Sequence, residues 1–159
     1  MNTEEIKITV PEGYEIDKEN STFECIKFKK KRLTYNDVAE KLFKNKKTYF
    51  IGALADISYY TPTCNMHQAN NAASEKQLKR LLAINKLMNV ATYLNGDWKP
   101  NFADGTDKWY LLWQGYAKQL DIIGLSHIRY VGPVFKTQKL ALQAIEILGE
   151  EEIKLALGV

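Results

Sequence analysis

The chain has 159 residues, of which 45% are hydrophobic and 26% charged, and its formal net charge is +3. These values are typical of globular proteins and argue against a disordered or fibrous chain. A chain of this length buries roughly 70% of its unfolded surface on folding, so we expect a single domain over residues 1–159. No apolar run is long enough for a membrane span and no secretory leader is recognised, so we expect a cytoplasmic protein.

The first predicted elements are strands. Residues 5–10 alternate polar and apolar side chains, which is the period of a strand with one buried face. An extended pattern resumes at residues 23–28 after a break at Pro11–Gly13, and residues 48–53 (TYFIGA) are a further β-rich run. We therefore expect the chain to open with an antiparallel pair and to add a third strand.

A short helix is predicted over residues 34–44, since Thr34 and Asp37 resemble an N-cap with an acidic first turn. A long helix follows over residues 74–95. Ser74 and Gln77 form a capping box at its start. Its predicted buried stripe is broad and consists of Leu78, Leu81, Leu82, Met88 and Ala91, widened by Ile84, Leu87 and Leu94.

The last third of the chain combines strands and helices. Residues 108–132 are rich in aromatic and β-branched side chains and predict two or three antiparallel strands, and residues 134–136 predict one more. Thr137 then caps a helix that Gly149 ends, and residues 150–157 form a closing helical segment. The predicted fold class is α+β, with an antiparallel sheet of about five strands packed against the long central helix and the C-terminal helix.

Four stretches cover most of the chain: PEGYEIDKENSTFECIKFK, LTYNDVAEKLF, one that contains LMNVATYLNGDWKP, and one that contains the closing AIEILGEE. Together they resemble a family of uncharacterised proteins from phages and prophages of gut bacteria. The resemblance implies a phage setting inside a host cell and assigns no activity and no site residue.

Metal binding and catalysis find little support in the sequence. Cys64 and His67 form a C-x-x-H pair, but a structural zinc site needs four ligands, and Cys25 and His127 add no paired spacing. We expect no metal, no cofactor and no disulfide. No nucleophile or phosphate-loop motif is present, and the surroundings of Asp97, Asp104 and Asp107 are those of turns, so we expect a protein that is not an enzyme.

Two features suggest a ligand surface. Between Lys27 and Lys47 the sequence contains nine basic residues and two acidic ones. Within this segment, the run of Lys29, Lys30, Lys31 and Arg32 could neutralise phosphates. The alternative is the solvated face of an edge strand. Aromatic residues are dense in the middle of the chain, and alternation places Tyr110 and Trp113 on opposite strand faces, so that one row is exposed for stacking unless both faces are covered.

The predicted function is that of a non-enzymatic phage protein that binds a ligand inside the host cell. The ligand is either anionic (a nucleic acid or a nucleotide) or a host protein, and blocking a bacterial defence system would be one use of such binding. We assign Lys29, Lys30, Lys31, Arg32, Tyr110 and Trp113 to the ligand site. The alternatives are a virion or assembly component, which would be a homo-oligomer, and a small enzyme that uses the loop carboxylates.

Overall fold

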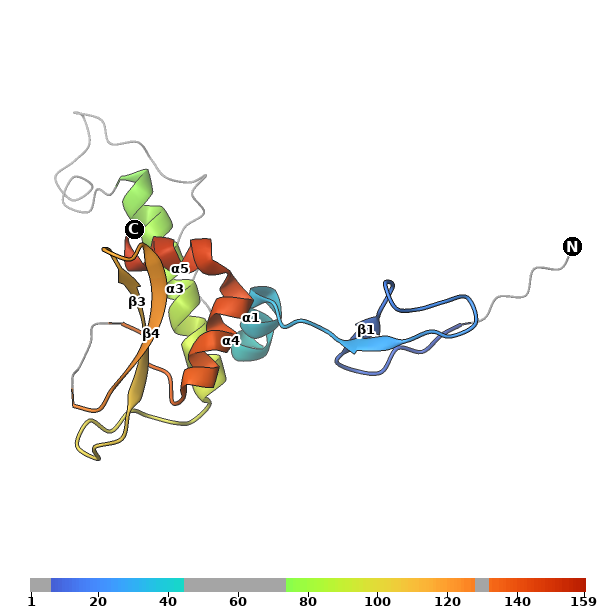
Figure 1. Ribbon diagram of the computed structural model, residues 1–159, viewed down its shortest axis with the longest axis horizontal. Coiled ribbons are helices and arrows are strands. Elements are labelled where there is room, and N and C mark those ends of the chain that lie inside the picture. The colour runs from blue at the N-terminus through green and yellow to red at the C-terminus, as the bar shows by residue number, and fades with distance from the viewer. Residues whose placement is uncertain (1–6, 45–73, 128–131) are drawn as a thin grey trace, which may run out of the picture. The chain divides into compact units, whose positions relative to one another are not determined.

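The computed structural model describes residues 7–44, 74–127 and 132–159 (Figure 1). The chain divides into two compact units, Met1–Leu33 and Thr34–Val159. The predicted strand at 48–53 lies outside the described residues, as do Cys64 and His67.

The first unit contains a two-stranded antiparallel sheet, β1 (Tyr14–Ile16) and β2 (Phe28–Lys30). Tyr14 lies opposite Lys30 and Ile16 lies opposite Phe28. None of the described residues 7–33 is buried. An isolated two-stranded hairpin is at best marginally stable in water, so this unit has little stabilisation of its own.

The predicted strands at 5–10 and 23–28 are displaced from the observed ones. Residues 7–10 form no strand, and residues 22–25 form a tight turn instead. In that turn the Thr22 and Cys25 backbones exchange hydrogen bonds, and the Cys25 N–H also donates to Thr22 Oγ1 at 3.1 Å. Side-chain capping of this kind favours turns over ladders, which explains the later start of β2.

The described residues of the second unit form four helices and a hairpin of two strands (Figure 1). Both predicted N-caps are confirmed, because Thr34 with Asp37 and Ser74 with Gln77 form capping boxes. The helices are α1 (Tyr35–Phe43), α3 (Glu75–Asn95), α4 (Gln138–Leu148) and α5 (Glu150–Leu157). The strands are β3 (Lys108–Gln114) and β4 (Gln119–Leu125).

The mixed α+β class is confirmed, but the predicted sheet of about five strands is wrong. The structure has two antiparallel sheets of two strands each among the described residues. The predicted strand at 134–136 contributes a single bridge, in which Phe135 pairs with Trp109 of β3. In this register Pro133 would lie opposite Leu111, and proline has no N–H with which to continue the ladder.

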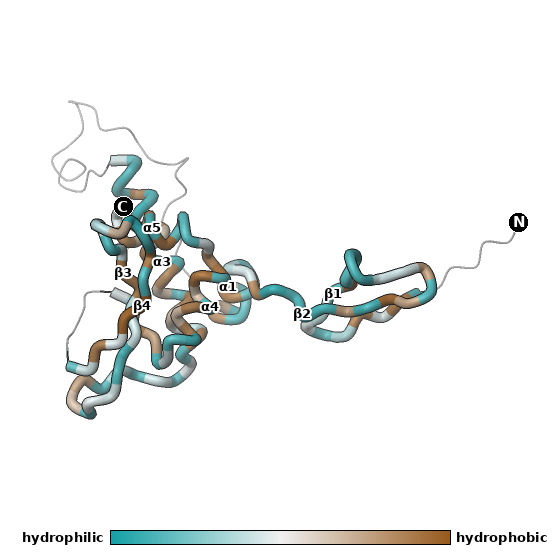
Figure 2. The backbone as a smooth tube through the Cα atoms, in the orientation of Figure 1, coloured by the Kyte–Doolittle hydropathy of each residue, from teal (hydrophilic) through white to brown (hydrophobic). Residues whose placement is uncertain are grey.

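The core of the second unit lies between the hairpin and the helices. Helix α3 is central, because it contacts α1, α4 and α5, while the hairpin packs on α4 and α5. Hydrophobic residues occur in each of these elements (Figure 2). The fully buried side chains include Val38, Val90, Phe135 and Ile153.

The buried face of α3 differs from the predicted stripe. The buried residues are Ala83, Leu87, Val90 and Ala91. Leu81 and Met88 were expected in the stripe but are 51% and 54% exposed. When apolar residues cover most of the circumference of a helix, the periodicity of the sequence does not show which of them face the core.

Candidate functional site

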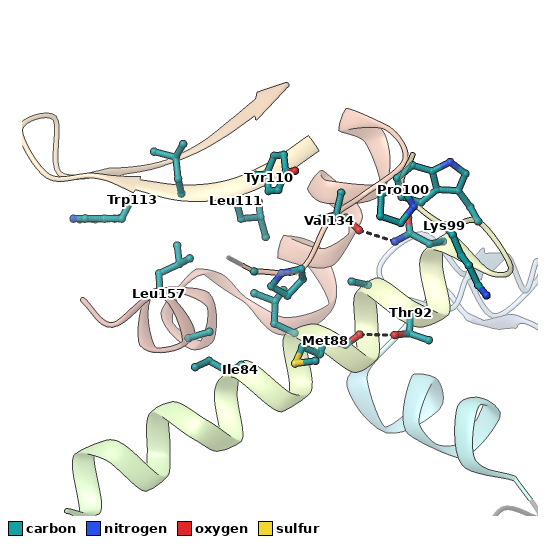
Figure 3. A pocket seen from close by; sticks show the side chains of 18 of the residues that line it. Ile84, Met88, Thr92, Lys99, Pro100, Tyr110, Leu111, Trp113, Val134 and Leu157 are labelled. Atoms are coloured by element: carbon teal, nitrogen blue, oxygen red, sulfur yellow. Dashed lines mark hydrogen bonds between the residues drawn. The ribbon is translucent and has the colours of Figure 1, made fainter. Parts of the chain in front are cut away.

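A pocket of about 1280 Å³ opens in the second unit between α3, β3 and α5. Residues 96–100 after α3 and residues 132–134 before Phe135 complete its wall. Figure 3 shows Ile84 and Met88 on α3, Leu157 on α5, and Leu111 and Trp113 on β3 around the same space. The lining is therefore mostly apolar.

Asn95 fixes one wall of the pocket. Its Nδ2 donates to the Val134 carbonyl at 2.7 Å (Figure 3). Its Oδ1 accepts from the Lys136 N–H at 2.9 Å. This single side chain at the end of α3 therefore ties down the segment on both sides of Phe135. The Asn95 side chain thus holds the wall built from residues 132–134 through two hydrogen bonds to main-chain groups.

Trp113 is half-buried on another wall and is held by a lysine. The Lys154 Nζ lies 5.2 Å from the centroid of the Trp113 ring, within the range of a cation–π contact. Lys154 also forms ion pairs with Glu151 at 2.9 Å and Glu150 at 3.0 Å, and these two carboxylates raise the pKa of Lys154. The lysine thus stays charged over the ring and orients it.

Charged groups of both signs lie among the lining residues. They are Arg80, Asp97 and Lys99. A Cβ atom added to Gly158 would lie 2.6 Å from the Arg80 Cζ, so the guanidinium packs against the backbone that ends α5. Because the charges are mixed, the pocket has no strong preference for an anion or a cation.

Of the three aspartates considered for catalysis, Asp97 lines the pocket and Asp104 has a structural role. Asp104 accepts hydrogen bonds from the Thr106 N–H and Oγ1 at 3.0 and 2.7 Å, and from the ammonium of Lys108. Lys108 is fully buried, and its Nζ also donates to the Thr106 carbonyl at 2.8 Å. The carboxylate of Asp104 thus closes a turn and neutralises a buried lysine, as the turn interpretation expects.

The six residues predicted to bind a ligand are divided between the two units. Lys29, Lys30, Lys31 and Arg32 are exposed and belong to the first unit, with Lys29 Nζ 3.8 Å from Glu15 Oε1. Tyr110 and Trp113 belong to the second unit. Both line the pocket, but Tyr110 is only 2% exposed, so little of its ring is open for a base to stack on, whereas Trp113 is half-buried. A joint site of all six residues stays a prediction.

Sequence reasoning missed most of the pocket. Met88 and Leu157 were assigned to the core or to a closing turn, although both line the cavity. It also missed Tyr14 and Phe28, which lie in the basic hairpin and are 48% and 37% exposed. The excess width of the apolar stripe on the long helix was the one sequence signal that a second apolar surface was present.

Within the three described ranges, no cluster of three or more His, Cys, Asp or Glu side chains has the geometry of a metal site. Cys25 is a free, exposed cysteine. No helix in the described part of the chain is long and apolar enough to cross a membrane. Comparisons of the chain with protein-family models, with curated proteins and with solved structures found no match.

Proposed function

We propose that the chain is a non-enzymatic binding protein and that the pocket of its second unit holds an apolar part of the ligand. The observation that carries the proposal is the pocket itself, about 1280 Å³ in volume and lined mainly by aliphatic, aromatic and proline side chains. Ligand pockets in proteins are commonly about 300–1,000 Å³ and mostly apolar, with a few polar groups that orient the ligand. The dimensions here suit a drug-sized molecule or several side chains of a larger partner.

Two lysine substitutions on one helix test this proposal. Met88 lines the pocket and is 54% exposed, whereas Leu81 is 51% exposed and lies outside the lining. Met88→Lys places a charge in an apolar wall and should weaken binding of the neutral dye Nile red by about tenfold or more. Leu81→Lys should leave binding unchanged.

The two variants form a matched pair, because each replaces a half-exposed apolar side chain of α3 by lysine. Neither change removes a buried group, so both proteins should keep the melting temperature of the parent within a few degrees. Equal dye binding by both variants would show that the pocket is not the binding site.

A second candidate function, binding of a nucleic acid or a nucleotide, rests on the hairpin of the first unit. Its strand β2 carries Lys29 and Lys30, and the cross-strand neighbour of Lys30 is the exposed Tyr14. A basic strand beside an exposed aromatic ring suits a single-stranded nucleic acid, since lysines neutralise phosphates and rings stack on bases.

The salt dependence of binding distinguishes this candidate. Replacing Lys29, Lys30, Lys31 and Arg32 by Gln should weaken binding of a short single-stranded DNA and lower the salt slope by roughly 0.7 to 0.9 per lost contact. Replacing Tyr14 by Ala should weaken binding without changing that slope. Absence of binding by the parent protein at low salt would exclude the candidate.

In the phage setting that the resemblance implies, we propose that the ligand is a host molecule. Blocking a bacterial defence system would be one use of such binding. The pocket favours a host protein and the hairpin favours a host nucleic acid, so the two tests above also separate these partners.

A further inference from the structure

The pocket extends along most of the length of α3. Its lining residues on this helix run from Arg80 to Asn95, a distance of about 22 Å at a rise of about 1.5 Å per residue. Figure 3 shows Ile84 and Thr92 along the helix, with Trp113 of β3 on the opposite side of the same space. The pocket is therefore about as long as four helical turns.

The pocket has a buried apolar floor and an exposed rim. Leu87 and Ala91 of α3 and Leu111 of β3 line it and are buried. Met88 and Thr92 also line it and are exposed. A partner can therefore place apolar side chains on the floor while its own polar face stays in solvent.

The described walls of the pocket offer few free main-chain groups. The backbones of α3 and α5 are hydrogen-bonded within their helices, and β3 is paired with β4. Beyond β3, the carbonyl of Val134 accepts a hydrogen bond from Asn95. A protein segment that enters the pocket must therefore satisfy its own backbone hydrogen bonds, and an α-helix does so internally.

Arg80 places a positive charge at one end of the pocket. It is exposed, and it forms no ion pair with another residue of the three described ranges. Its guanidinium is held against Gly158, where an added Cβ atom would lie 2.6 Å from Cζ. The other charged lining residues, Asp97 and Lys99, follow the opposite end of α3. Because a guanidinium pairs well with a carboxylate, charge complementarity favours a partner with an acidic residue beside Arg80.

We infer that the pocket binds an amphipathic α-helix of another protein, with the apolar side chains of that helix on the floor and an acidic residue beside Arg80. The inference rests on the proposed function of the pocket. Anchor residues at i, i+4, i+7 and i+11 lie on one face of a helix and span about 16 Å, which fits the length of the pocket. The volume of about 1280 Å³ exceeds the roughly 300–1,000 Å³ of common small-molecule pockets, which favours several side chains over one small ligand.

The first test uses a peptide of about four helical turns, selected from a random library on the full chain. Each of its positions is replaced by alanine and, separately, by proline, and affinity is measured by fluorescence anisotropy. For a bound helix, alanine should weaken binding only at anchors three or four residues apart. Proline should weaken binding about tenfold or more at every position of the helix interior, because it breaks the helix. Met88→Lys should weaken the peptide and Leu81→Lys should not.

A charge exchange tests the contact with Arg80. Arg80→Glu should weaken the peptide about tenfold, and replacing the acidic residue of the peptide by lysine should restore part of that affinity. Lys76→Glu is the matched control, because it makes the same change of charge on an exposed residue of α3 outside the lining. At physiological salt it should change the affinity by about twofold or less.

The possible results separate the inference from the proposed function. If Met88→Lys weakens Nile red but no peptide binds, the ligand is a small molecule and the helix inference is wrong. It is also wrong if proline and alanine have equal effects at every position, or if Arg80→Glu and Lys76→Glu weaken the peptide equally. If light scattering shows a dimer that Met88→Lys alone dissociates, the occupant is a second copy of the chain, which also overturns the inference. If Met88→Lys and Leu81→Lys bind the dye equally, the proposed function itself fails.

Discussion

Lys108 is a buried cation whose charge is compensated within one short turn. Its side chain is fully buried, and its ammonium has Asp104 Oδ1, the Thr106 carbonyl and Thr106 Oγ1 as acceptors. The ring of Phe102 lies 5.9 Å from the Nζ. A buried ammonium is costly unless it is paired and fully hydrogen-bonded, and here three acceptors satisfy its three protons.

Removing the carboxylate should destabilise the fold at neutral pH. Asp104→Asn leaves the Lys108 ammonium buried without an opposite charge, so we expect a lower melting temperature at pH 7. Adding Lys108→Met removes the uncompensated charge and should restore part of the loss, because replacing both partners costs less than replacing one. An Asp104→Asn variant as stable as the parent would mean that the pair does not contribute to stability.

The same pair predicts how stability depends on acid. Hydrogen bonds from Lys108 and then Thr106 lower the pKa of Asp104 from 3.8 to about 2. Because the folded pKa lies below the unfolded one, the stabilisation is complete above about pH 4 and is lost as the pH falls towards 2. Urea unfolding between pH 5 and pH 2 should show a smaller loss of stability for Asp104→Asn than for the parent over this window.

At the scale of elements, the buried side of α3 overlaps with the wall of the pocket. Ala83 and Val90 are buried and lie outside the lining, Leu87 and Ala91 are buried and line the pocket, and Met88 and Thr92 are exposed and line it. The sequence predicted the helix from its capping box at Ser74 to Asn95, since capping depends on residues that are close in sequence. The sequence could not show which part of the broad apolar surface of α3 packs in the core and which part is open to a ligand, because this depends on where α4 and α5 pack.

Substitutions to alanine on α3 test this division. Leu87 is 2% exposed, and Leu87→Ala should reduce the free energy of unfolding by about 2 to 5 kcal/mol, because it removes buried methyl groups and leaves a cavity. Leu81 is half-exposed, so Leu81→Ala should change the free energy of unfolding by about 0.5 kcal/mol or less. Urea denaturation of both variants gives the comparison, and equal effects would contradict the observed burial.

The strands were predicted less well than the helices, for a related reason. The hairpin of β3 and β4 was predicted, since aromatic and β-branched residues occur there in two runs around a turn. The described residues form two sheets of two strands each in place of the predicted five-stranded sheet. Turn hydrogen bonds at Thr22 and Cys25 shorten β2, and Pro133 limits the predicted last strand to one bridge. Strand pairing is set by distant partners and by such local interruptions, which a periodicity does not reveal.

At the scale of the whole molecule, burial is distributed unequally between the two units. Every buried side chain among the described residues belongs to the second unit, from Val38 to Ala156. The first unit has only the short ladder of β1 and β2 and the turns around it. Because the hairpin of β1 and β2 has few contacts of its own, the free energy of its local opening should be far below that of global unfolding.

Hydrogen exchange on the full chain tests this difference. The amides of Asp17 and Lys31, which bond across the hairpin to Lys27 and Gly13, should exchange quickly, while the amides of β3 and α3 should be strongly protected. Leu87→Ala should speed exchange of the amides in β3 and α3 and leave the exchange rates of the amides in the β1–β2 hairpin unchanged. Slow exchange at Asp17 and Lys31 in the free protein would contradict this expectation.

Ligands should add protection at the place where they bind. A short single-stranded DNA that engages Lys29 and Lys30 should slow exchange of the hairpin amides, because binding stabilises the paired state of β1 and β2. An apolar ligand in the pocket, such as Nile red, should instead slow the amides of lining residues on α3 and β3, among them Met88 and Trp113. The two patterns fall on different units, so one experiment with each ligand identifies the binding surface. Protection of neither set of amides by a bound ligand would place its site elsewhere in the chain.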